Sequence, residues 1–188
     1  GRPYRHKRGH RKEDLQMQSC EFVIHPLTGN DAGAVLAFSR QIGGETDHLT
    51  FGPEGLPLGE EQERGFLEKA ADTPDRLMLG AWDGERLVGT AEIARLSNKA
   101  RLAHRAQFAV SVARSHWNRG IASALACRCL QRAREMGCTV VELEVLENNA
   151  PAIHLYQKLG FSAVGRHPCF FRYADGRCAP ALLMHCYL

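Results

Sequence analysis

Alternating apolar and polar positions predict a series of β-strands along this chain. The pattern is clearest over residues 139–145, where Val141, Leu143 and Val145 alternate with glutamates, as on a strand with one buried face. Asp83-Gly84 is a two-residue turn signal between two such runs and predicts a hairpin. The predicted strands cover residues 20–27, 76–82, 86–96, 101–113, 139–145, 161–173 and 181–187.

Apolar residues that recur every three or four positions predict four helices. Asn30-Asp31 is a capping signal for the first helix, which Gly43-Gly44 is expected to end. In the third helix, Ile121, Leu125 and Cys129 form an inner stripe. The predicted helices cover residues 31–41, 59–71, 118–136 and 149–159.

The order of these elements predicts the fold class. It runs strand, two helices, three strands, helix, strand, helix and two strands. We therefore expect an α/β fold with a mixed, mostly antiparallel central sheet and helices on both faces. The stretch 45–58 contains Pro53 and Pro57 and has no strong periodicity, so it is predicted to be a loop.

Charge is distributed unevenly along the 188 residues. Residues 1–12 hold six of the 24 basic residues and no acid, so the remaining 18 basic residues face 21 acids and leave a net charge of about −3. Residues 1–16 are predicted to be a basic, disordered leader, and residues 17–188 a single domain. A basic leader can bind nucleic acid, but we favour a disordered extension, a cloning remnant or an upstream translation start.

The cysteines and the apolar runs narrow the class of protein further. Seven cysteines lie scattered over predicted strands and a helix, as is typical of buried thiols. Cys127 and Cys129 lie two positions apart on a helix and point to different faces, so no metal site is expected. No apolar run has the length of a membrane span and none precedes a cleavage-like site, which predicts a cytoplasmic protein.

The stretch from Val110 to Leu125 carries the first sign of a binding site, because a strand there breaks into a turn and then a helix. The unpaired N–H groups and positive dipole end of a helix start favour an anion such as phosphate. Gly120 and Ala122 are small enough to let phosphate oxygens approach the main chain, and Arg119 adds a positive charge. A tight turn alone would also explain Gly120, so a second motif is needed.

The second motif lies downstream, and the pair resembles the GCN5-related N-acetyltransferase (GNAT) family. Gly120 and Ala122 match the motif Gln/Arg-x-x-Gly-x-Gly/Ala, whereas Trp117 stands where the family has Gln or Arg. Residues 149–161 match every defined position of Asn-x-x-Ala-x-x-Leu-Tyr-x-x-x-Gly-Phe. The resemblance implies the acyl-CoA N-acyltransferase fold and acetyl-CoA as cosubstrate.

The resemblance also implies where acetyl-CoA binds. Strands 108–112 and 139–145 are expected to splay apart around its pantetheine arm, whose amides pair with the main chain of Val110 and Val112. Asn149 is expected to contact the arm, to cap its helix, or to do both. The residues expected at the pyrophosphate turn are Trp117, Asn118, Arg119, Gly120, Ile121 and Ala122.

The resemblance and the strand pattern also point to candidate catalytic groups. Tyr156 matches the family's tyrosine that protonates the leaving thiolate, with a packing role as the alternative. The glutamate base of histone-type members falls on Ala106 here, so another group must serve. His104, two residues earlier and on the same strand face, and Glu92 on the neighbouring strand are the candidates, since imidazole titrates near neutral pH and a carboxylate acts directly or through water. Surface roles are the alternative for both.

The expected function is acetyl-CoA-dependent acetylation of a primary amine by direct attack in a ternary complex. The acceptor is a small amine, an amino acid, or an amino group of a peptide or protein. The alternatives are a non-catalytic acyl-CoA-binding module and a nucleic-acid-binding protein acting through the leader. A homodimer is left open, and no membrane partner is expected. Glu45 and Asp47 in the loop predict a preference for cationic acceptors.

Overall fold

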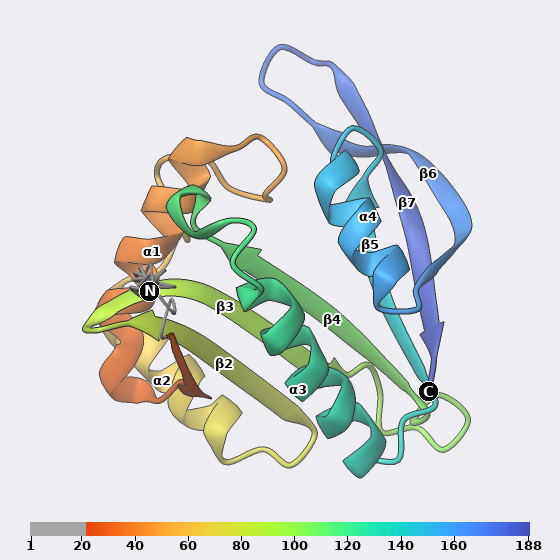
Figure 1. The fold of residues 1–188 in the computed structure, drawn as a ribbon, viewed down its shortest axis with the longest axis horizontal. Helices are drawn as coiled ribbons and strands as arrows, with labels where there is room; N and C mark the ends of the chain where they lie inside the picture. Colours follow the sequence, from red (N-terminus) through yellow and green to blue (C-terminus); the bar gives the residue numbers. More distant parts are fainter. Residues whose placement is uncertain (1–21) are drawn as a thin grey trace, which may run out of the picture.

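The computed structural model describes residues 22–188, which contain a seven-stranded sheet in the order β1-β2-β3-β4-β5-β7-β6 (Figure 1). All neighbouring strands are antiparallel except β4 and β5, which are parallel. The predicted mixed, mostly antiparallel sheet is confirmed. The predicted leader, residues 1–16, lies outside the described residues. The strands are β1 (Val23–Pro26), β2 (Arg76–Asp83), β3 (Arg86–Arg95), β4 (Arg105–Val112), β5 (Val140–Leu146), β6 (Ser162–Arg172) and β7 (Cys178–Tyr187).

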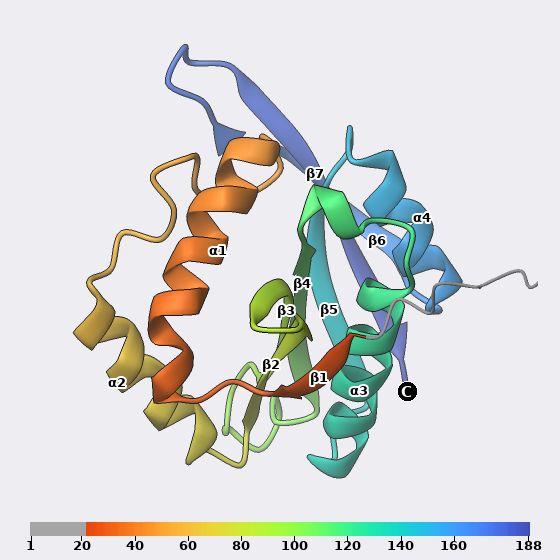
Figure 2. The same ribbon diagram turned by 60° about the vertical axis from the view of Figure 1, so that its left-hand side comes forward.

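Helices cover both faces of the sheet, as expected (Figure 2). Two lie on one face and two on the other, and two short 3-10 helices occur in connections. The first pair is α1 (Ala32–Glu45) and α2 (Glu60–Ala71), and the second is α3 (Ile121–Glu135) and α4 (Ala150–Lys158). The 3-10 helices are η1 (Gly29–Asp31) and η2 (Arg114–His116).

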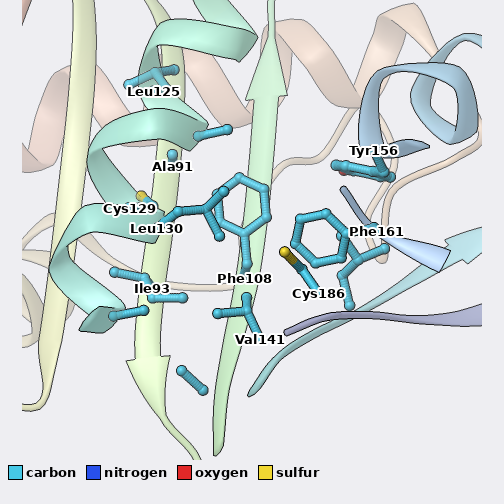
Figure 3. Packing of buried hydrophobic residues seen from close by; sticks show 14 of the residues in the cluster. Ala91, Ile93, Phe108, Leu125, Cys129, Leu130, Val141, Tyr156, Phe161 and Cys186 are labelled. Atoms are coloured by element: carbon cyan, nitrogen blue, oxygen red, sulfur yellow. The ribbon is translucent and has the colours of Figure 1, made fainter. Parts of the chain in front are cut away.

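The larger core lies between the sheet and helices α3 and α4. Ile121, Leu125 and Cys129 on α3 are all buried in it, which confirms the predicted inner stripe. Figure 3 shows this core, with the rings of Phe108, Tyr156 and Phe161 close to one another, and residues of α3 beside β3 and β4. A smaller core fills the space between the sheet and helices α1 and α2.

Helix α1 continues through Gly43 and Gly44 and ends at Glu45, so the predicted end at the glycine pair was wrong. A Cβ at Gly43 would lie 1.9 Å from the carbonyl oxygen of Gly52. Gly43 therefore permits the following loop to pass against the helix rather than ending it. A glycine pair in a sequence can mark the end of a helix or a place where another backbone passes close to it, and the sequence alone does not distinguish the two.

Other predicted boundaries also moved. Strand β4 begins at Arg105 instead of residue 101, because residues 101–104 form a turn. Helix α3 begins at Ile121, not residue 118, since Asn118 and Gly120 both have positive φ. Strand β7 begins at Cys178, three residues earlier than predicted.

The prediction that the cysteines are buried thiols holds only in part. Cys129 is buried, as are Cys138 and Cys186, whereas Cys127 is exposed, which confirms that Cys127 and Cys129 point to different faces of α3. Cys169 and Cys178 form a disulfide between β6 and β7, which corrects the expectation of free thiols there. Within residues 22–188 no helix is long and apolar enough to cross a membrane.

Candidate functional site

Strands β4 and β5 separate after a short parallel ladder. The ladder joins residues 105–107 to residues 140–142 and ends there, and the two strands then diverge in Figure 1. The N–H of Ala113 donates to Val88 on β3 at 2.9 Å. Because backbone groups alternate sides along a strand, those of Val110 and Val112 point away from β3, into the gap. The expected splay is therefore present, with both predicted residues on its edge.

The turn that follows β4 presents backbone N–H groups to open space. Asn118 and Gly120 have φ values of 60° and 78°, and a Cβ built at Gly120 would meet no atom within 4 Å. The helix begins here, with Ala124 donating to the carbonyl of Gly120 at 3.0 Å. The N–H groups of the first helical turn, including Ile121 and Ala122, therefore have no intrahelical acceptor. Such a turn suits an anion.

Trp117, which stands where the family motif has Gln or Arg, makes contacts within the protein. Its indole Nε1 donates to the carbonyl oxygen of Val112 at 2.8 Å, and its ring lies 5.6 Å from the guanidinium of Arg114. The side chain thus joins the turn to the end of β4. It brings no positive charge to the turn, whereas the exposed Arg119 does.

A histidine that the sequence analysis overlooked braces the same segment. His116 is 7 % exposed, and its Nε2 lies 3.0 Å from Oδ2 of Asp83, the last residue of β2. Its Nδ1 lies 2.8 Å from the hydroxyl of Ser115. These contacts connect η2 to the neighbouring hairpin. The sequence carried no signal for them, because Asp83 and His116 are 33 residues apart.

A cavity of about 370 Å³ lies on the α1 and α2 face of the sheet. Its lining is largely apolar and includes Val35, Phe38, Phe51, Leu56, Phe66 and Met78. Val110 also lines this cavity, so the edge of the strand gap and the cavity meet at that residue. A molecule in the gap and a molecule in the cavity can therefore come into contact.

Glu92, a predicted site residue, lines this cavity. On β3 it lies opposite Met78 of β2 and Ala109 of β4, which share its face of the sheet. Its Oε1 is 3.3 Å from Nε of Arg76. Burial raises the pKa of Glu92 above the usual range, and the charge of Arg76 opposes that rise. Glu92 can therefore accept a proton closer to neutral pH than an ordinary carboxylate.

Glu63, which the sequence analysis missed, lines the same cavity. It is 2 % exposed and lies on the inner stripe of α2 with Leu67 and Ala70. Burial, and secondly the charge of Glu92, raise the pKa of Glu63. The spacing of Glu63, Leu67 and Ala70 on one helical face was the signal that could have found it.

Tyr156 lies on the opposite face of the sheet, on α4, and is 8 % exposed. Its ring contacts Phe108 edge-on at 6.3 Å between centroids and Phe161 at 5.9 Å (Figure 3). Burial alone raises the pKa of Tyr156 to about 12, so its hydroxyl keeps its proton at neutral pH. At the start of α4, Oδ1 of Asn149 accepts a hydrogen bond from the N–H of Ala152 at 3.4 Å, as expected of a cap.

His104, the other candidate base, is not brought to the cavity. It is exposed and lies in the turn before β4, six residues from Val110 and so roughly 20 Å away along an extended chain. The reasoning behind the prediction also fails, because Ala106 is fully buried in the core on the α3 side. Ala106 is not among the residues that line the cavity.

The loop acids also differ from expectation. Oε2 of Glu45 accepts a hydrogen bond from the N–H of Arg114 at 2.8 Å, and the carbonyl of Asp47 accepts one from the hydroxyl of Tyr173 at 3.2 Å. Both acids line a second, polar cavity beside the β6–β7 hairpin. Phe51, between these acids and Pro53, lines the apolar cavity instead.

Comparison with known proteins supports the same reading. The Acetyltransferase (GNAT) family model matches residues 46–161, more than half of the chain. Streptothricin acetyltransferase of Streptomyces lavendulae is 35 % identical over 107 residues, 57 % of this chain and 54 % of that protein. The chain thus spans about half the length of this curated relative.

Solved structures share the fold. A GNAT-family acetyltransferase of Streptococcus pneumoniae is 26 % identical, with a TM-score of 0.84 over 89 % of this chain and 100 % of that one. The yncA protein of Salmonella typhimurium, solved with its cofactor acetyl-CoA, is 18 % identical, with a TM-score of 0.76 over 89 % and 94 % of the two chains. At that identity it supports the fold alone. The fold is that of the acyl-CoA N-acyltransferases, and the chain belongs to the GNAT family.

Proposed function

We propose that this chain transfers the acetyl group of acetyl-CoA to a primary amine by direct attack in a ternary complex. One observation carries the proposal: Val110 borders the strand gap and also lines the apolar cavity. An acyl donor in the gap would meet an acceptor in the cavity at that residue. Because both substrates can be present together, no covalent enzyme intermediate is required.

The proposed acetyl-CoA site fits the residues present. The main chain of Val110 and the N–H of Val112 lie beyond the end of the β4–β5 ladder and suit the amides of the pantetheine arm, whereas the carbonyl of Val112 accepts from Trp117. The turn from Trp117 to Ala122 suits the pyrophosphate, since it has open space at Gly120 and a helix start. When bound, acetyl-CoA supplies the thioester carbonyl that the amine attacks.

We assign the proton transfers to the two ionisable groups on either side of β4. Glu92 accepts a proton from the acceptor ammonium and passes it to solvent, because only the neutral amine is a nucleophile. Tyr156 donates its hydroxyl proton to the departing thiolate and recovers the second proton that the amine loses. The N–H of Val110, which points into the gap, polarises the carbonyl.

Release of free thiol from acetyl-CoA, measured against a broad panel of amines, tests the proposal. We expect release that depends on both the amine and the enzyme, with an acetylated amine detected by mass spectrometry. Glu92→Gln should lower kcat/KM by roughly 10²–10⁴-fold. Glu85→Gln, at an exposed position in the β2–β3 turn, is the matched control and should match the wild type.

The alternative outcome identifies an acyl-CoA-binding module. Such a module would bind CoA in calorimetry and release no thiol with any amine. The nucleic-acid hypothesis rests on residues 1–16, outside the described chain, and predicts binding that is lost when they are removed and that falls steeply with salt.

Two finer expectations stay predictions. Cytoplasmic location is one, and it requires the pair Cys169 and Cys178 to be reduced there, because cytosolic thiols are kept reduced. A homodimer is the other, which light scattering of the purified chain would test.

A further inference from the structure

A carboxylate occupies a position on α2 where the helix pattern calls for an apolar residue. Glu63 precedes Leu67 by four positions and Ala70 by seven, and all three are buried against the sheet. Helix α2 has other glutamates, but Glu61 has 90 % of its side chain exposed and pairs with Arg64 at 3.7 Å. Glu63 is 2 % exposed. On this helix, therefore, the carboxylate of Glu63 is shielded from water and that of Glu61 is solvated.

No protein cation compensates the charge of Glu63 within residues 22–188. Its side chain forms no ion pair or hydrogen bond there, and the charged group that acts on it is a second carboxylate, Glu92. Glu92 itself has Arg76 at 3.3 Å. An unpaired buried carboxylate is unfavourable for folding, so a cation from outside the protein is the partner that would justify it.

The other residues that line the cavity indicate what kind of molecule would carry this cation. Aromatic and aliphatic side chains line it, among them Phe38, Phe51 and Phe66. No Lys or Arg of the described chain lines it, and Arg76 is already engaged with Glu92 and lies over the ring of Phe66 at 5.3 Å. The hydroxyl of Ser39 is taken by the main chain, donating to Leu36 and accepting from Leu56. A substrate carboxylate would find no free cation here.

We propose that Glu63 selects the acceptor: it binds the ammonium of an amine with an apolar, arylalkyl-sized body and no carboxylate beside the amino group. Glu63 holds the charged amine in the cavity, and Glu92 then takes the proton that must leave before attack. This inference rests on the proposed acetyl transfer for its consequence in catalysis. The binding it describes does not depend on any reaction.

A binding experiment without acetyl-CoA tests the selection alone. The probes are 2-phenylethylamine, charged at pH 7, and 2-phenylethanol, a neutral molecule of the same shape. We expect the wild type to bind the ammonium roughly 10–100-fold more tightly, the range for a hydrogen bond to a charged group. Glu63→Gln, which keeps the side chain's size, should remove most of that preference. Glu61→Gln, on the same helix, should retain it.

A kinetic experiment tests the consequence for catalysis. 2-Phenylethylamine and phenylalanine share an aromatic body and differ in the carboxylate, and we expect kcat/KM to favour the amine at least about tenfold in the wild type. Glu63→Gln should raise KM for the amine far more than it lowers kcat and should narrow that ratio.

The two proposals fail in distinguishable ways. If the wild type does not prefer the ammonium over the alcohol, including the case in which neither binds, the role of Glu63 is refuted. An unchanged preference in Glu63→Gln refutes it as well. If the preference is present and Glu63-dependent but no amine releases thiol, the binding site stands and the acetyltransferase proposal fails.

Discussion

The indole Nε1 of Trp117 donates a 2.8 Å hydrogen bond to the carbonyl oxygen of Val112, and this bond joins the proposed phosphate turn to the end of β4. Nearly half of the residue is open to solvent, since Trp117 is 47 % exposed. The residue therefore does little for the core. Its contribution is to hold the turn in register with the strand that forms the edge of the gap.

Trp117→Phe should weaken CoA binding without a large loss of stability. A single hydrogen bond contributes about 0.5–1.5 kcal/mol net, which corresponds to roughly a 2–10-fold increase in the dissociation constant. Isothermal calorimetry with CoA is the measurement. Trp82→Phe is the matched control, because Nε1 of Trp82 has no partner among the described residues and loses no hydrogen bond. Equal affinities for wild type and Trp117→Phe would separate this bond from cofactor binding.

Gly120→Val should abolish CoA binding by filling the space in front of the turn. The helix offers its own control at the other end, because Gly137 has φ of 76° against 78° for Gly120 and also faces open space. Left-handed backbone costs about 1–2 kcal/mol for a non-glycine residue, so both valine variants should lose stability in urea unfolding. Only Gly120→Val should lose CoA affinity, and retention of that affinity would mean that the site is misplaced.

Tyr156→Phe should keep CoA affinity and lower kcat by on the order of 10²–10⁴-fold, because it removes only a proton donor. Tyr187→Phe, at a 71 % exposed position, is the control. Because burial raises the pKa of Tyr156 to about 12, the hydroxyl stays protonated throughout an assay from about pH 6 to about pH 10. The rate should therefore show no basic limb from Tyr156. An unchanged kcat when chemistry limits the rate would leave Tyr156 as a packing residue.

The pH dependence of kcat/KM should report Glu92. A base must be ionised, so activity should rise with pH as Glu92 loses its proton. Because burial raises the pKa of Glu92, this rise should lie above the usual range for a carboxyl group. The residual activity of Glu92→Gln should lack that limb. If the variant retains the same acidic limb, another group serves as the base.

Glu63→Gln should make the protein more stable at neutral pH. Because the pKa of Glu63 is raised above its ordinary value of 4.5, the folded state binds a proton more tightly than the unfolded state does. Wild-type stability therefore falls as pH rises from 4.5 through the raised pKa, whereas a glutamine does not titrate. At about pH 4 the carboxyl group is largely protonated in both states, so the difference in Tm between variant and wild type should be small there. The difference should grow as the pH rises to about 7. Glu61→Gln, on the exposed side of α2, should show no such growth.

The local patterns of the sequence determined much of the framework. Alternation predicted a strand over residues 139–145, and the structure has it at Val140–Leu146. The stripe on α3 and the asparagine cap of α4 are also present. These features depend on neighbours within a turn or two of the chain, so a single stretch of sequence contains the information that specifies them. The two motifs were sufficient to predict the family.

The acceptor side of the site was decided by tertiary structure. Glu92 was a candidate on the sequence, but the cavity beside it depends on α1, α2 and three strands meeting on one face. Glu63 and Glu92 are 29 positions apart, and His104 lies away from the cavity because residues 101–104 form a turn where a strand was predicted. Burial and unpaired charge are properties of everything packed around a group, not of the residue itself. The sequence alone determined which side chains could do chemistry, and the packing of distant elements decided which of them share a cavity.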